Sequence, residues 1–281
     1  MAVLPFGIVA DEIHRDFRVA VETGTRIGLA RYEVRNLTTG RVPLVDAAEL
    51  AAVEELCRER DLKVTAISPG LFKLTDTREA FEREMREVYP RSAELAQRWG
   101  LPGLIVFGFH KAGATEANAA SFSSANPPAE IVEWLAEAGE RAARDGLTLM
   151  IEPEPICWCD SGRATAALIR RAGLNLVGID SLKINYDPGN VAWLENRDPI
   201  GEFADVAEFV ANVHIKDLRP LVHGAGSPEW VPAGEGMIDY RAHLAALRGA
   251  GYVGPYSLEP HTGGEGIDAC AAAFEKLWRG E

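Results

Sequence analysis

Short apolar runs alternate with amphipathic helical stretches along nearly the whole chain, and this alternation limits the folds that the chain can adopt. Runs of consecutive apolar residues are typical of strands in a parallel sheet, which is covered on both faces. The runs lie at residues 6–10, within 25–34, and at 62–67, 104–107, 147–152, 182–187, 212–217 and 256–259. Eight strands that are each followed by a helix predict an α/β fold, a single (β/α)8 TIM barrel rather than an open doubly wound sheet. A length of 281 residues is normal for one such barrel, so we expect a single domain over residues 1–281.

Several residues mark where helices are expected to begin. Asp46 is expected to cap a helix, and Glu49 to complete a capping box with it. Ser161 is expected to cap a later helix, and Pro90 to kink or split the helical region around it. Asn126, which precedes two prolines, is expected to cap the helix between the fourth and fifth strands.

The charge balance and the cysteines exclude several classes of protein. A net charge of −13 argues against a nucleic-acid-binding protein and against binding to an anionic membrane, because both need clustered Lys and Arg. A small neutral substrate or a bound cation fits this charge better. The sequence shows no signal peptide and no long apolar span, so we expect a cytoplasmic protein. The four cysteines form no CxxC pair, so we expect reduced thiols and do not expect Cys157 or Cys159 to bind a metal.

Glu152 follows directly on the apolar run at 147–151 and is therefore expected at the end of a buried strand. Burying an unpaired carboxylate costs roughly several kcal/mol, so a cation or hydrogen bonds are expected beside it. Asp187, His214 and Glu259 end three later strands in the same manner. Because the carboxyl ends of barrel strands share one face, the four side chains are expected to converge. Three carboxylates and one imidazole fit a divalent ion that prefers oxygen, such as Mn2+, Mg2+ or Co2+, better than a sulfur-rich zinc site.

Each of these four residues also has an ordinary interpretation. Glu152 can face solvent or pair with an arginine, and Glu259 can lie at the rim of the barrel. His214 can be a hydrogen-bonded core histidine, and Asp187 can cap the turn that follows it. A solvated surface explains one such residue, but it does not explain polar groups at the ends of four strands.

Five motifs carry a resemblance to a known family: Ile151-Glu152-Pro, Tyr186-Asp187-Pro-Gly-Asn190, Val213-His214-Ile-Lys216-Asp217, Pro232-Ala-Gly-Glu-Gly236 and Leu258-Glu259-Pro. Together they resemble the xylose isomerase-like TIM barrels, the sugar phosphate isomerase/epimerase superfamily, over nearly the whole chain. The resemblance implies that one divalent metal ion is bound by Glu152, Asp187, His214 and Glu259. It also implies that Glu152 and Glu259 face opposite sides of the substrate as acid and base. The family includes inosose and dehydroshikimate dehydratases, hydroxypyruvate isomerase, ketose 3-epimerases and endonuclease IV, and the fold does not choose among them.

Two departures from the family narrow the choice. Ketose epimerases and endonuclease IV are similar in placing a histidine three residues after the aspartate that corresponds to Asp187, and this chain has Asn190 there. We keep Asn190 as a candidate substrate contact. The third strand ends in Ser68-Pro69 without a histidine, and the acidic charge opposes a DNA partner, so a nuclease is not expected.

Three further residues are candidates for substrate contact, and each has an ordinary alternative. His110, just after the fourth strand, can contact the substrate or be a structural loop histidine. Lys216 can stabilise a developing oxyanion, and Arg219 can hold a distal hydroxyl or acid group. The alternative for both cations is an ion pair with Asp217 or Glu235.

The chemistry that these residues support is proton removal from a carbon next to a carbonyl. We expect a divalent-metal-dependent isomerase or epimerase of a small sugar or cyclitol, which works through a metal-stabilised enediolate. One alternative is a lyase that dehydrates a keto-cyclitol or keto-sugar with the same site, and another is a non-catalytic metal- or sugar-binding barrel. Mn2+ is the preferred ion, with Mg2+, Co2+ and Zn2+ as alternatives. The Gly-rich loop at 218–237 is expected to close over the substrate. We expect no nucleic-acid or membrane partner, and the sequence does not decide whether the protein forms a homo-oligomer.

Overall fold

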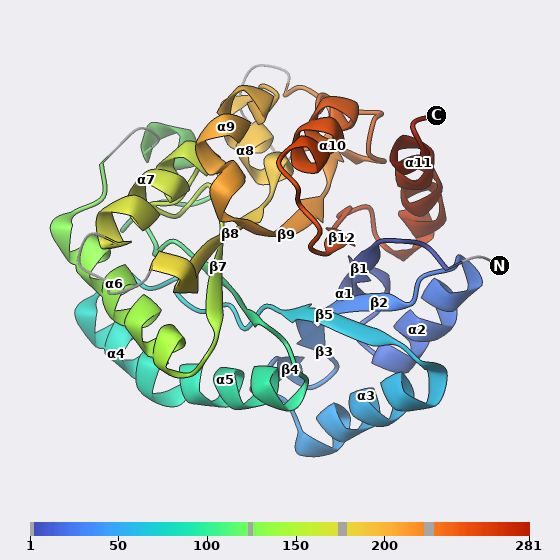
Figure 1. Cartoon of the computed structure of the whole chain (residues 1–281), viewed down its shortest axis with the longest axis horizontal. Helices are drawn as coiled ribbons and strands as arrows, with labels where there is room; N and C mark the ends of the chain where they lie inside the picture. The colour runs from blue at the N-terminus through green and yellow to red at the C-terminus, as the bar shows by residue number, and fades with distance from the viewer. Residues whose placement is uncertain (1–2, 123–125, 174–178, 222–227) are drawn as a thin grey trace.

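The computed structural model describes residues 3–122, 126–173, 179–221 and 228–281, and it confirms the predicted (β/α)8 TIM barrel (Figure 1). The eight barrel strands are β1 (Gly7–Val9), β2 (Arg31–Val34), β5 (Lys63–Ile67), β6 (Gly103–Phe107), β7 (Thr148–Glu152), β8 (Leu182–Tyr186), β9 (Val210–Ile215) and β12 (Tyr256–Leu258). They are parallel and follow the order β5-β2-β1-β12-β9-β8-β7-β6. β5 and β6, at the two ends of this order, contact each other, so the barrel is nearly closed.

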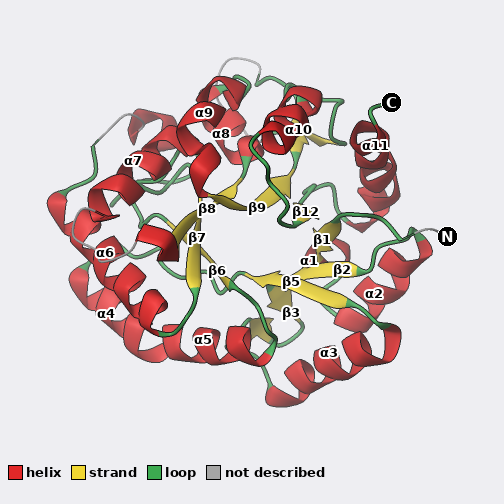
Figure 2. Ribbon diagram, in the orientation of Figure 1, coloured by secondary structure: helices red, strands yellow, loops and turns green. Residues whose placement is uncertain are grey.

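Helices form a ring outside the strands, as Figure 2 shows. In chain order they are α1 (Ala10–Ile13), α2 (Phe17–Arg26), α3 (Ala47–Arg60), α4 (Arg78–Glu87), α5 (Tyr89–Arg98), α6 (Ala129–Arg144), α7 (Gly162–Gly173), α8 (Pro188–Glu195), α9 (Phe203–Val206), α10 (Tyr240–Gly249) and α11 (Ile267–Arg279). The sequence patterns did not predict α2, which connects β1 to β2. Within the described ranges, no helix combines the length and the apolar character that crossing a membrane requires.

Two short antiparallel ribbons accompany the barrel, and both bear on the site. The first pairs β3 (Asn36–Leu37) with β4 (Gly40–Arg41), directly after β2. The second pairs β10 (Asp217–Leu218) with β11 (Trp230–Val231), after β9. Each ribbon follows the carboxyl end of a barrel strand, which is the end that carries the active site in barrels of this kind.

Alternate residues along a strand face opposite sides of the barrel wall, and this alternation directs the polar groups inward. Leu149 and Ile151 of β7 pack in the large core formed with the helices. Met150 instead belongs to a small separate cluster with Ile105, its partner on the neighbouring strand β6. Glu152 lies two residues beyond Met150 and therefore shares its side, which is the inside of the barrel.

The helix boundaries agree with the sequence in part. α5 begins with Pro90 in its first turn, so the predicted split of that helical region is confirmed. Ser161 accepts a hydrogen bond of 3.1 Å from the Ala164 N–H, which confirms its predicted cap of α7. The predicted capping box is wrong, because Asp46 makes no side-chain cap. Glu49 instead accepts hydrogen bonds of 2.7 and 3.1 Å from two backbone N–H groups of the β3–β4 turn.

The predicted cap of α6 is also wrong. The helix begins at Ala129 and has Pro128 at its N-cap position, without a side-chain cap. Asn126 lies two residues earlier, because both prolines precede the helix instead of forming its first turn.

Candidate active site

Four neighbouring strands bring the predicted metal-binding side chains together at the carboxyl end of the barrel. Glu152 is the last residue of β7, and Asp187 directly follows β8. His214 lies in β9, and Glu259 directly follows β12. These strands are consecutive in the barrel order, and all four side chains are buried.

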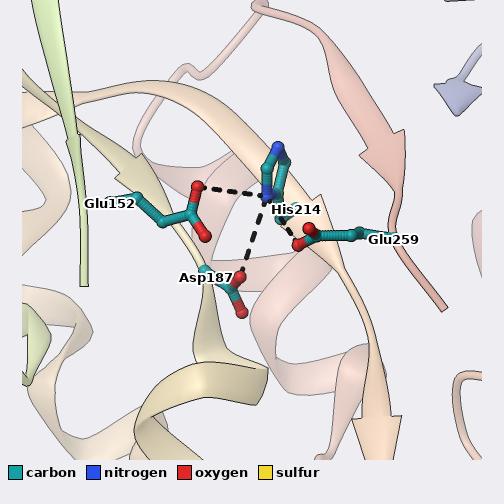
Figure 3. A group of neighbouring side chains, drawn as sticks. All are labelled: Glu152, Asp187, His214 and Glu259. Atoms are coloured by element: carbon teal, nitrogen blue, oxygen red, sulfur yellow. Dashed lines mark ion pairs between the residues drawn. The ribbon is translucent and has the colours of Figure 1, made fainter. Parts of the chain in front are cut away.

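His214 lies at the centre of this group (Figure 3). Its Nδ1 atom lies 3.0 Å from Glu259 Oε2 and 3.7 Å from both Glu152 Oε2 and Asp187 Oδ2. Glu152 and Glu259 approach the imidazole from opposite sides (Figure 3). One donor atom from each of the four residues lies within 4.8 Å of the other three, so the group could hold a metal ion.

Glu33 of β2 orients the imidazole from its other side. Its Oε2 atom lies 2.9 Å from His214 Nε2, and both side chains are buried. A carboxylate on Nε2 holds a proton there, so Nδ1 is the atom that would bind a metal ion when the imidazole is neutral. No motif in the sequence pointed to a role for Glu33, although a charged residue inside an apolar strand was a signal for one.

Two cations neutralise the carboxylates on one side of the group. Lys216 Nζ lies 2.8 Å from both Asp187 Oδ2 and Glu259 Oε2. Arg35, to which no sequence motif pointed either, contacts Glu259 as well. Burial opposes ionisation, but Lys216 and His214 outweigh it, so the pKa of Glu259 lies well below its ordinary value and the pKa of Asp187 is lowered. Both carboxylates are therefore charged at neutral pH.

Glu152 lies in a different electrostatic environment from Glu259. Its two oxygens accept hydrogen bonds from neutral amides, at 3.0 Å from Asn185 Nδ2 and 3.1 Å from Asn190 Nδ2. Burial, together with the negative charges of Glu259 and Asp187, raises the pKa of Glu152 to about 7 against the opposing pull of the nearby cations. The two glutamates therefore differ in proton affinity although they are close in space.

The donor set fits a divalent metal ion. Asp187 Oδ2 is buried and, among the described residues, accepts no hydrogen bond, although the Lys216 ammonium lies at ion-pair distance. Three carboxylates and an oriented imidazole are ligands of Mn2+, Mg2+, Co2+ and Zn2+. Cys157 and Cys159 are buried but lie outside the group of four.

A cavity of about 210 Å³ adjoins the four residues, and Glu152 and Glu259 both line it. Its aromatic lining consists of Phe107, Trp193 and Trp230. Its cationic lining consists of Arg35, Arg41, Lys73 and Lys216. The cavity can therefore take a small polar molecule in contact with both glutamates.

The structure brings two of the four predicted substrate contacts to this cavity. Asn190 and Lys216 line it, and Asn190 Nδ2 also donates a 2.8 Å hydrogen bond to the Pro153 carbonyl. His110 is not among the described lining residues, because its ring lies beside the loop after β6, with Nε2 3.0 Å from the Ala114 carbonyl oxygen.

Arg219 does not reach the cavity lining either. Its side chain is 53 % exposed and forms a 2.8 Å ion pair with Glu229. The partner is therefore neither Asp217 nor Glu235, because the β10–β11 ribbon places Arg219 opposite Glu229. His110 and Arg219 therefore lie outside the described lining of this cavity, and their contact with a substrate stays a prediction.

The loop at 218–237 lies partly outside the described residues, including His223, Gly224 and Gly226, so its predicted closure stays a prediction. The described part is anchored by Asp217, whose carboxylate accepts hydrogen bonds of 2.9 and 3.1 Å from Gly234 N–H and Gly236 N–H. This anchor holds the ribbon that carries Trp230 to the cavity.

The sequence profile of the family described as xylose isomerase-like TIM barrel matches residues 25–277. The chain belongs to the xylose isomerase-like TIM barrel family. The family resemblance found in the strand-end motifs is thereby confirmed.

Curated relatives and solved structures that resemble this xylose isomerase-like barrel are named for different activities. A 73-residue segment is 37 % identical to L-ribulose-5-phosphate 3-epimerase UlaE of Salmonella paratyphi C (strain RKS4594), and covers 26 % of this chain and 24 % of the relative. A crystal structure of the IOLI protein with a zinc atom aligns with a TM-score of 0.74 at 17 % identity, over 98 % of both chains. The probable 3-DHS dehydratase AsbF of Bacillus anthracis aligns with a TM-score of 0.69 at 18 % identity, over 96 % of this chain and 98 % of that chain. Both structural likenesses show the fold alone.

Proposed function

We propose that this barrel is a divalent-metal-dependent isomerase or epimerase of a small sugar or cyclitol. The observation that carries the proposal is the position of Glu152 and Glu259, which flank His214 from opposite sides and both line the cavity. A carbon next to a carbonyl, held between them, has one carboxylate on each face. That arrangement suits removal of a proton on one face and its return on either face.

Glu152, Glu259 and Lys216 have different roles in the proposed proton transfer. Glu152, held by the neutral amides of Asn185 and Asn190, can accept a proton and give it up again. Lys216 and Arg35 keep Glu259 ionised, and their positive charges make it a weaker base. Glu259 becomes a stronger base than Glu152 for the first proton removal when those two cations contact the substrate instead. Lys216 Nζ can then donate a hydrogen bond to an oxygen that gains negative charge.

A divalent ion held by Glu152, Asp187, His214 and Glu259 would supply Lewis-acid stabilisation of negative charge on the substrate. Mn2+ remains our preferred ion, and the zinc atom in the IOLI structure keeps Zn2+ among the alternatives. The aromatic side chains that line the cavity would help to exclude water from the enediolate.

A second candidate is a lyase that dehydrates a keto-cyclitol or keto-sugar. It is favoured by the same pair of glutamates, because one can remove the proton while the other protonates the departing hydroxide. The structural likeness to the probable 3-DHS dehydratase AsbF is consistent with this candidate but does not select it. The non-catalytic binding barrel is the weakest candidate, because two differently tuned glutamates in one cavity offer a binding protein no advantage. The cytoplasmic location and the homo-oligomer stay predictions.

The test is a screen of the Mn2+-loaded protein against keto-sugars, their phosphates and inososes in D2O, read by proton NMR. Loss of the substrate signal next to the carbonyl, with an isomer or epimer formed, supports the first candidate. Formation of an unsaturated product with release of water supports the lyase. The absence of any exchange or product across the set would contradict both.

A further inference from the structure

Arg41 is held in a fixed orientation on the wall of the cavity. It belongs to β4 of the first ribbon, and its partner Ser68 follows β5. Arg41 Nε donates a 2.8 Å hydrogen bond to the Ser68 carbonyl, and Nη2 donates another of 2.8 Å to Ser68 Oγ. Two parallel contacts fix the plane of the guanidinium, and both residues line the cavity.

Gly70 leaves the space that this guanidinium occupies. A Cβ atom at Gly70 would lie 2.9 Å from Arg41 Nε and 3.1 Å from Arg41 Cζ, so the guanidinium would have to shift. The glycine has a φ of +81°, which disfavours a larger residue for a second reason. The third strand ends in Ser68-Pro69, where the sequence has no histidine. Ser68 and the following Gly70 instead leave room for the side chain of Arg41.

The other cations of the cavity have carboxylate partners. Lys73 Nζ lies 2.9 Å from Glu154 Oε2, and Lys216 and Arg35 hold the carboxylates described above. Among the residues that the structure describes, none places a carboxylate within ion-pair distance of Arg41. The cavity also has the exposed Glu116 in its lining, and it too forms no ion pair with Arg41 in the described part of the chain.

A half-buried guanidinium that forms no ion pair is less stable than a paired one. Burial and the neighbouring positive charge of Arg35 lower the pKa of Arg41, against the opposing effect of the carboxylates of Glu152, Asp11 and Glu259, none of which forms an ion pair with it in the described part of the chain. An arginine presents its N–H groups in a planar fork that matches a carboxylate or a phosphate. Nε and Nη2 are already used by Ser68, while the structure shows no described acceptor for Nη1.

We propose that Arg41 binds an anionic group of the substrate, so that the substrate is a phosphorylated or carboxylated keto-sugar or keto-cyclitol. This inference rests on the proposed function, because it concerns a ligand of the same cavity. The reacting carbon lies between the two glutamates, and the anionic group lies at the Arg41 end of the cavity. Phosphate and carboxylate share the chemistry that Arg41 recognises, and the experiment distinguishes them.

The first experiment measures anion binding without turnover. The full-length protein, without added metal, is titrated by calorimetry with methyl phosphate, with glycolate and with uncharged glycerol at constant ionic strength. We expect one or both anions to bind and glycerol not to bind. The Arg41→Gln variant should weaken the affinity for the anion by at least about tenfold, as for the loss of a charge-assisted contact. Arg58→Gln, which removes an exposed charge on α3, is the matched control and should bind as the wild type does.

The outcomes separate the two anions and test the inference. Binding of methyl phosphate alone indicates a phosphate ester, binding of glycolate alone indicates a sugar acid, and binding of both supports either. No anion binding by the wild type, or equal binding by a folded Arg41→Gln protein, would overturn the inference. If Arg41→Gln does not fold, Arg41→Lys takes its place, because lysine cannot present the planar fork and should also bind more weakly.

A second experiment separates this inference from the proposed function. Deuterium exchange is measured for a ketose phosphate, a keto-acid sugar and the free ketose, with wild type and Arg41→Gln. We expect Arg41→Gln to raise KM for the charged substrate by at least about tenfold more than it raises KM for the free ketose. Exchange that is equal in both proteins for every substrate overturns the role of Arg41 and leaves the isomerase standing. Anion binding that depends on Arg41, without exchange of any substrate, overturns the isomerase instead.

Discussion

Glu152 and Glu259 are the residues on which the proposed chemistry depends, and their surroundings differ. Neutral amides surround Glu152, whereas cations contact Glu259. Glutamine keeps an oxygen that can coordinate a metal but cannot carry the proton, so we expect each Glu→Gln variant to lose turnover by ~10²-fold or more. Metal content should fall less than activity, and steady-state kinetics with metal analysis of the same samples measures both.

The control for these variants is Glu79→Gln on the exposed face of α4, which should turn over as the wild type does. If one variant still exchanges the substrate proton with D2O but forms no product, its glutamate acts in the second step. Wild-type turnover by both variants, with metal bound, would show that the acid–base assignment is wrong.

Glu33 is expected to act through His214 and not on the substrate. It holds Nε2 at 2.9 Å and so presents Nδ1 to the metal position. Glu33→Gln should lower metal affinity by about 10- to 100-fold, as for other carboxylates that hydrogen-bond a metal-binding histidine. Isothermal titration with Mn2+ or Zn2+ measures the change, and Glu94→Gln on the exposed side of α5 serves as control. Unchanged affinity in the Glu33 variant would show that the histidine needs no such support.

At the scale of elements, the β10–β11 ribbon depends on one buried carboxylate. Asp217 accepts backbone hydrogen bonds from Leu218, Gly234, Gly236 and Ile238. Asp217→Ala leaves these donors without an acceptor, so we expect a loss of about 1–3 kcal/mol in the free energy of unfolding. Hydrogen exchange should quicken at residues 230–238, and Asp268→Ala on the exposed start of α11 should change little. Unchanged exchange in the ribbon would mean that the strand pairing suffices to hold it.

The whole molecule should respond to pH through the four central side chains. The lowered pKa values of Asp187 and Glu259 add stability that is present above about pH 4.5 and is lost as the pH falls. The pKa of His214 is raised well above 6.5 by the surrounding carboxylates, against its burial. The stability that His214 adds is therefore full below pH 6.5 and is lost as the pH rises. Because the pKa of Glu152 is raised from 4.5 to about 7, Glu152 lowers the stability of the protein progressively as the pH rises between these two values.

The metal-free protein should therefore be most stable at about pH 4.5 and weaken as the pH rises, through Glu152 up to about pH 7 and through His214 above pH 6.5. A divalent ion needs neutral imidazole and ionised carboxylates, so the rise in Tm on adding Mn2+ should grow from pH 5.5 to pH 8. Thermal melts with EDTA and with Mn2+ across this range measure the effect. His214→Ala should remove most of the rise, and an equal rise at every pH would contradict the assignment of these ligands.

Much of the fold and part of the site could be predicted from the sequence. The alternation of apolar runs and helices gave the barrel, because period and length are local properties of each segment. The positions of Glu152, Asp187, His214 and Glu259 followed, because parallel strands in a barrel end on one face. His110 lies in a loop whose path no periodic pattern sets, so its direction could not be predicted.

The sequence by itself determined which strands exist, which side chains point inward and which four polar groups converge. Only the tertiary structure decided their partners, because a partner depends on which strands become neighbours when the barrel closes. Glu33 and His214 are separated by 181 residues, yet they share a hydrogen bond in the barrel interior. Arg41 meets Ser68 because two segments after different strands lie together at the barrel mouth. The polar residues at the strand ends can be identified from the local sequence, whereas their charged partners are set only when the barrel closes.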